Sequence, residues 1–84
     1  MSSPKPLPSL SPLAMSIVID GLYQHYKGLP YKVVTVALHS ETLEELVVYQ
    51  ALYGEKKTWV RPLKMFLESV TIDGKEIPRF QLTS

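Results

Sequence analysis

The stretch WVRPLKMF, residues 59–66, is the one around which the chain is organised. It holds the only tryptophan of the sequence and one of its two arginines. Pro62 stops the strand that precedes it and suits the first position of a helical turn. Apolar side chains then recur at i, i+3, i+4 and i+7 from Leu63. The stretch therefore predicts a strand end followed by one short helix or 3₁₀ segment near residues 62–68.

Short apolar or alternating segments on both sides of this stretch predict β-strands. The strands are expected over residues 22–27, 31–38, 46–53, 58–61, 70–72 and 75–77. In residues 31–38, Val34, Val36 and Leu38 are predicted to face the core. The alternate side chains of that strand, among them Val33, are predicted to face away from it.

Residues 46–53 are compatible with two structures. A capping box of Thr42 with Glu45, and Gly54 after the segment, favour a helix. The run Val47-Val48-Tyr49 favours a strand, and a helix apolar on all sides would need complete burial, which a small domain hardly provides. We predict a strand here.

The C-terminal part contains the clearest hairpin signal of the chain. Asp73-Gly74 suits a two-residue type I′ turn between strands 70–72 and 75–77. Phe80 is expected to fill the core. Five or six short strands with tight turns predict a mainly β fold, a small SH3-like, partly open barrel.

The N-terminal segment differs in composition from the rest. Residues 1–14 contain four of the seven prolines and four serines, a composition that disfavours both strand ladders and helices. We predict a flexible tail over residues 1–15 and a single small domain over 16–84. Met15 offers an alternative start of the chain.

Composition excludes several classes of protein. No cysteine is present, which rules out disulfides and thiolate metal sites and suits a cytoplasmic location. No apolar run approaches the ~20 residues that span a bilayer, so no membrane association is predicted. The net charge of +1 argues against a dedicated nucleic-acid-binding protein, which usually carries a larger basic excess.

Three polar residues raise the question of catalysis or metal binding. His25, His39 and Glu41 would supply a two-histidine, one-carboxylate metal site. Their spacing matches no known metal motif, and the adjacent His39-Ser40-Glu41 cannot converge as a catalytic triad. We therefore predict no catalytic residue, no metal and no cofactor.

The aromatic and arginine side chains form the stronger set of candidates. Tyrosine and tryptophan favour surfaces where one end of the ring stays wet, and arginine binds carboxylates or phosphates and stacks on rings. At least two of the six Tyr and Trp candidates are expected to be exposed beside Arg61 or Arg79, although each arginine has an ion pair with a glutamate as its alternative. The predicted ligand-binding residues are His25, His39, Glu41, Tyr49, Trp59, Arg61 and Arg79.

A series of ordered motifs carries a family resemblance: HYKG (25–28), HSET (39–42), LVVY (46–49), LYG (52–54), WVRP (59–62), MF (65–66) and PRF (78–80). They resemble the bacterial domain of unknown function 1653 family over about residues 20–82. The resemblance implies a small stand-alone SH3-like domain without an established activity, and it supports a strand at 46–53. Gln24 and Leu38 depart from the pattern, because arginine is common at both positions. If those arginines bind an anion, this chain binds it less well.

The sequence favours a non-catalytic binding module with an aromatic and basic groove for a peptide, a nucleotide-like or small anionic ligand, or single-stranded nucleic acid. One alternative is a small enzyme or metal-assisted hydrolase that uses His25, His39 and Glu41. Another is a structural module that oligomerises through an exposed sheet edge.

Overall fold

The computed structural model of the chain describes residues 10–84, which form seven strands and two short helices. In chain order these are α1 (Pro12–Met15), β1 (Leu22–His25), β2 (Pro30–Leu38), β3 (Glu45–Ala51), β4 (Thr58–Pro62), α2 (Leu63–Phe66), β5 (Ser69–Ile72), β6 (Lys75–Pro78) and β7 (Phe80–Leu82). No helix in this range is long and apolar enough to cross a membrane.

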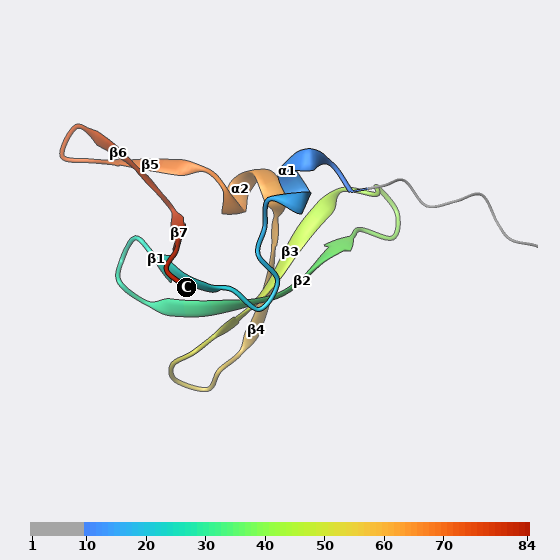
Figure 1. Cartoon of the computed structure of the whole chain (residues 1–84), viewed down its shortest axis with the longest axis horizontal. Coiled ribbons are helices and arrows are strands. Elements are labelled where there is room, and N and C mark those ends of the chain that lie inside the picture. The colour runs from blue at the N-terminus through green and yellow to red at the C-terminus, as the bar shows by residue number, and fades with distance from the viewer. Residues whose placement is uncertain (1–9) are drawn as a thin grey trace, which may run out of the picture.

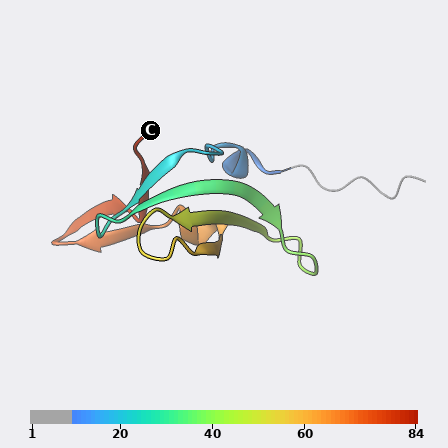
Figure 2. The same cartoon turned by 90° about the horizontal axis from the view of Figure 1, so that it is seen from below.

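Five of the strands form one antiparallel sheet in the order β4-β3-β2-β1-β7, while β5 and β6 form a separate hairpin. The hairpin projects from one end of the molecule (Figure 1), and the long strands β2 and β3 bow along their length (Figure 2). The prediction of a mainly β fold is confirmed. Within residues 10–84, β4 and β7 each pair on one side only, so the sheet does not close into a barrel.

A β-bulge in β2 changes which side chains face the core. The pairing of β2 with β3 shifts between Val33 and Thr35, which leaves Val34 without a partner. Val33 is completely buried, whereas Val34 is 41% exposed. The prediction that Val34 faces the core and Val33 faces away is therefore wrong, because one extra residue reverses the alternation up to that point. Val36, beyond the bulge, packs against the core as predicted.

The strand prediction for β3 is confirmed. Val47, Tyr49 and Ala51 are buried, and the residues between them are only partly covered, which is the two-residue period of a sheet. A turn at residues 54–55 follows, and β4 then leads into α2. Pro62 takes the N-cap position of α2 instead of its first turn.

The hairpin of β5 and β6 turns at Asp73-Gly74 as predicted. Asp73 has φ 51° and Gly74 has φ 78°, the two positive values that a type I′ turn requires. Val70 continues the apolar period of α2 in the sequence, but α2 ends at Phe66 and Val70 lies in β5, where it pairs with Ile77.

The core is built on aromatic rings from four elements. Phe66 of α2 is completely buried and stacks on Phe80 of β7, with ring centroids 4.3 Å apart and an interplanar angle of 6°. Tyr23 and Tyr49 each place a ring 5.4 Å from that of Phe66. The predicted role of Phe80 as a core residue is confirmed.

Residues 10–17 pack onto this core. Ser11 caps α1 by accepting the Ala14 N–H at 3.1 Å, and Ala14 and Ile17 are buried. The prediction that residues 1–14 form no helix is wrong for 12–14, because proline is tolerated in the first turn of a helix. Residues 1–9 of the predicted tail lie outside the described residues, and the domain boundary at residue 16 remains a prediction.

Two hydrogen bonds fasten α1 to the sheet. The Ser11 N–H donates to one oxygen of Glu45 at 2.6 Å, and the Ser11 hydroxyl donates to the other at 2.7 Å. The backbone hydrogen bond, and then the hydroxyl, lower the pKa of Glu45 from its ordinary value because both favour the charged carboxylate.

Replacing Ser11 with alanine is expected to raise the pKa of Glu45 part of the way back. Because its folded-state pKa is below the unfolded value, Glu45 contributes stability that is present above the unfolded value of 4.5 and is lost as the pH falls through the folded value. Ser11→Ala should therefore lose less stability on acidification than the wild type.

Carboxyl-carbon NMR measures the pKa of Glu45, and melting curves at several pH values measure the stability. Ser16→Ala, whose hydroxyl bonds only Leu13, is the control, and an unchanged Glu45 titration in Ser11→Ala would contradict the assignment.

Candidate functional site

The strand register places four of the predicted site residues on the core-facing side of the sheet. Tyr49 lies directly opposite Trp59, Val47 opposite Arg61, and His25 opposite Phe80. Directly opposed residues of antiparallel strands point to the same face. Because Tyr49, Val47 and Phe80 are buried core residues, Trp59, Arg61 and His25 project from the same face, at its uncovered margin.

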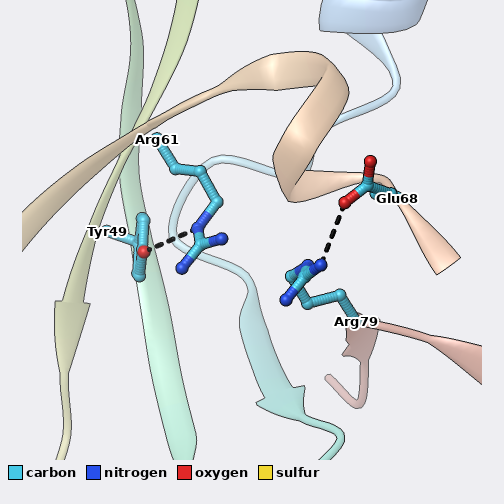
Figure 3. A network of polar contacts seen from close by, with 4 residues as sticks. All are labelled: Tyr49, Arg61, Glu68 and Arg79. Atoms are coloured by element: carbon cyan, nitrogen blue, oxygen red, sulfur yellow. Dashed lines mark hydrogen bonds and ion pairs between the residues drawn. The ribbon is translucent and has the colours of Figure 1, made fainter. Parts of the chain in front are cut away.

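Arg61 is held by aromatic groups. Its Nε–H donates to the Tyr49 hydroxyl at 3.2 Å (Figure 3). Its Cζ lies 5.7 Å from the centroid of the Phe80 ring. No carboxylate within residues 10–84 forms an ion pair with it. The guanidinium is therefore oriented by rings and a phenol, while its charge has no anionic partner in that part of the chain.

Arg79 has a different environment. Its Nη2 donates to Glu68 at 2.9 Å, so the ion-pair alternative applies to this arginine. Its Nε is buried without a hydrogen-bond partner among the described residues. In Figure 3 the side chain of Arg79, which lies between β6 and β7, extends towards that of Arg61. Two guanidinium groups and one carboxylate thus leave a surplus of positive charge at this point.

His25 lies within reach of that charge. Burial, followed by the positive charges of Lys27, Arg61 and Arg79, lowers the pKa of His25 from 6.5. Its Nδ1 accepts the Lys27 N–H at 3.2 Å, which places the proton of the neutral ring on Nε2. The ring packs edge-on against Phe80 with centroids 5.0 Å apart. At neutral pH, His25 is an uncharged hydrogen-bond donor.

A pair of tyrosines extends the aromatic surface from Arg61 towards the β3–β4 turn. The hydroxyl groups of Tyr31 and Tyr53 hydrogen-bond to each other, and the rings of Tyr31 and Tyr49 meet edge-to-face at 5.4 Å. Burial, then the hydrogen bond and charge of Tyr53, raise the pKa of Tyr31 to about 12, although Arg61 acts in the opposite direction. The Tyr31 phenol is therefore neutral under physiological conditions.

Beyond Tyr53 lies a pocket of about 210 Å³, which we call the Trp59 pocket. Trp59 and Tyr53 form its aromatic walls, and they are 52% and 37% exposed. The rest of its lining is Ala51, Gly54, Glu55, Lys56 and Lys57. Two of the aromatic candidates are thus exposed, while Tyr49 is buried. Neither arginine lines this pocket, so a shared groove with Arg61 or Arg79 stays a prediction.

His39 and Glu41 do not belong to this site. His39 Nδ1 accepts the N–H groups of Glu41 and Thr42 at 3.1 and 3.2 Å, which stabilises the turn between β2 and β3. This turn follows the end of β2 that is distant from His25. At the rise of a strand, the turn lies roughly 25 Å from His25. His25, His39 and Glu41 therefore do not converge. No group of three or more metal-ligating side chains occurs within residues 10–84.

Comparison with known proteins identifies the family. Residues 21–82 match the family described as "Protein of unknown function (DUF1653)". The chain belongs to the DUF1653 family. The crystal structure of a DUF1653 protein from Bordetella bronchiseptica is similar, with 35% sequence identity and a TM-score of 0.73 over 83% of this chain and 92% of that one. No curated protein matches the chain.

Gln24 and Leu38, the two positions predicted to depart from the family pattern, line pockets to which Arg61 does not contribute. Gln24 borders a second depression, together with His25, Tyr26 and Pro78. Leu38 borders a larger pocket of about 520 Å³ near α1. An arginine at either position would extend from a different place on the domain than Arg61 does.

Sequence reasoning missed two parts of the site in this DUF1653 chain. Phe80 was predicted only as a core residue, yet its ring also packs against the guanidinium of Arg61 and the imidazole of His25. Glu68 was not predicted as the partner of Arg79. The motif Pro78-Arg79-Phe80 was the only signal, since it places a cation directly beside an aromatic residue.

Proposed function

We propose that this DUF1653 domain is a non-catalytic binding module, and that the surface around Arg61 binds the anionic group of a peptide, a nucleotide-like ligand or single-stranded nucleic acid. The observation that carries this proposal is the orientation of Arg61 by Tyr49 and Phe80 without a carboxylate partner in residues 10–84. An arginine held in this way loses little further conformational entropy when it binds a ligand. It also presents a fork of N–H donors.

The hydrogen-bonding groups around Arg61 support an anion over other ligands. Arginine has only donors, and the Tyr49 hydroxyl, which accepts from Arg61, keeps its own proton to donate. Neutral His25 offers its Nε2–H, and one proton of the Tyr31–Tyr53 pair is not used between the two hydroxyls. A cluster of donors with so few acceptors suits a phosphate or a carboxylate.

The proposal also covers the architecture, the cellular location and the self-association of the domain. The bowed five-stranded antiparallel sheet supports an SH3-like architecture, with the aromatic and basic surface along its open side. The cysteine-free sequence supports a cytoplasmic location, and the similar protein from Bordetella bronchiseptica supports a bacterial source. Self-association is the second candidate role, and it is favoured by Val60, which is 57% exposed on the edge strand β4.

Replacing Arg61 with glutamine tests the proposal. Titration of the ¹⁵N-labelled domain with pyrophosphate is expected to shift the amide signals around Arg61 and Tyr49. Because a hydrogen bond to a charged group is worth about 1.5–3 kcal/mol, Arg61→Gln should weaken binding roughly 10- to 150-fold. Tyr49→Phe, which removes only the hydroxyl, should have a smaller effect in the same direction.

The matched control is Lys64→Gln, which removes the same charge from the exposed face of α2, three residues along the chain. It should leave the affinity for pyrophosphate unchanged. Equal weakening by Arg61→Gln and Lys64→Gln would mean that pyrophosphate responds only to net charge, and the proposal would fail. Circular dichroism of each variant establishes that the fold is retained.

A further inference from the structure

We infer that the ligand of this surface is a nucleotide unit, with its phosphate at Arg61 and its base stacked on Trp59. The inference rests on the proposed function, because it uses the same anion site and names the chemical class that occupies it. The base is assigned to the Trp59 pocket, which the anion proposal alone does not use.

The spacing of the two side chains supports one nucleotide. Trp59 and Arg61 are separated by one residue on β4 and project from the same face of the sheet. Alternate residues on one face of a strand are roughly 6.6 Å apart. This separation is comparable with that between the phosphate and the base of a single nucleotide, so one ligand can contact both side chains without distortion of the strand.

Trp59 is suited to stacking by its surroundings. Half of its surface is exposed, and no aromatic ring within residues 10–84 packs against the indole. Tyr53 forms the other aromatic wall of the pocket and is held in place by its hydrogen bond to Tyr31. An exposed indole beside a fixed phenol offers a platform on which any base can stack.

The polar rim of the pocket is also appropriate for a base and its backbone. Lys57 pairs with Glu55 at 3.2 Å, which leaves the neighbouring Lys56 without an ion pair among the described residues. Together with Arg61 and Arg79, these residues form a short basic margin along the aromatic surface. A chain of net charge +1 with so short a margin fits one or two phosphates better than a long nucleic acid.

Fluorescence of the intact domain tests the inference directly, because Trp59 is the only tryptophan of the chain. Adenosine and uridine monophosphates are expected to quench its emission. Base stacking should make them bind about 5- to 150-fold more tightly than ribose 5-phosphate, which carries the phosphate without the base. Calorimetry of Trp59→Ala should show that this advantage is lost, while the affinity for ribose 5-phosphate is unchanged. Trp59→Phe should be intermediate.

Val60→Ala is the matched control, because Val60 is exposed on the same strand but points to the opposite face. It should leave all affinities unchanged. A tetrathymidylate oligonucleotide distinguishes the two sources of the nucleotide unit. Tighter binding than that of the monophosphates identifies single-stranded nucleic acid, and equal or weaker binding identifies a free nucleotide; either result supports the inference.

Two results would overturn the inference while leaving the proposed function intact. One is equal affinity for ribose 5-phosphate and the nucleotides, which would mean that the base contributes nothing. The other is equally tight binding of a glutamate-rich peptide that is abolished by Arg61→Gln. If neither pyrophosphate nor any of these probes binds, the proposed function itself fails together with the inference.

Discussion

Replacing Phe66 with alanine is expected to have the largest effect of any single substitution, a loss of about 3–5 kcal/mol of unfolding free energy. The ring is completely buried and stacks on Phe80, and the edges of Tyr23 and Tyr49 close around it. Three rings therefore lose contacts around one cavity. A domain of this length has a total stability of roughly 4–13 kcal/mol, so Phe66→Ala removes much of it.

Urea denaturation followed by circular dichroism measures this loss. Phe66→Leu, which keeps much of the volume, should lose less than the alanine variant. Met65→Ala is the matched control, since Met65 precedes Phe66 in α2 but is 46% exposed. It should change stability by about 0.5 kcal/mol or less. A midpoint for Phe66→Ala equal to that of Met65→Ala would contradict the assignment of Phe66 to the centre of the core.

Replacing Gly21 with alanine is expected to have the second largest effect on stability, about 1–3 kcal/mol. A Cβ atom at this position would lie 2.8 Å from the carbonyl oxygen of Val18 and 3.1 Å from Cδ1 of Leu82. The Gly21 N–H donates to that same Val18 oxygen at 3.0 Å, and the Gly21 carbonyl accepts the Val33 N–H. Neither backbone group can move away without breaking a hydrogen bond.

Thermal melting of Gly21→Ala should show the loss. The double variant Gly21→Ala, Leu82→Ala separates the two contacts, because it removes the side-chain clash and leaves the backbone one. We expect little recovery relative to Leu82→Ala alone, since the shorter contact is with backbone. Full recovery would show that the flexible Leu82 side chain is the obstacle, and a melting temperature of Gly21→Ala equal to the wild type would contradict the close approach itself.

Much of the fold follows from local sequence signals. Asp73-Gly74 predicts its turn because few other dipeptides adopt positive φ at both positions. The helix after Pro62 and the strand at Val47-Val48-Tyr49 follow from similar local preferences. Which face of the sheet Val33 and Val34 occupy could not be predicted, because a bulge depends on the pairing of two distant segments. The helical turn at Pro12 is also stabilised from a distance, by Glu45.

The site was predictable in its residue types and less so in its grouping. Arg61 and Trp59 stand on one strand at alternate positions, so their shared face follows from the sequence once β4 is known. His39 was placed in the same set because imidazole is rare in the chain, yet its nitrogen serves a turn. Which arginine has a carboxylate partner depends on Glu68 of another segment, and no sequence pattern links the two.

The pairing of β7 with β1 has a consequence for how the chain acquires its structure. Tyr23 pairs with Leu82, and the Leu22 N–H donates to the Ser84 carbonyl, so the first and the last strand meet in one ladder. Such distant pairing requires closure of a long loop before any stabilising contact forms, which slows folding to the range of milliseconds to seconds. During synthesis on the ribosome, Phe80, on which Phe66 stacks, is added after the other three rings of the core. The nascent chain therefore keeps its apolar centre open until translation of β7 is complete.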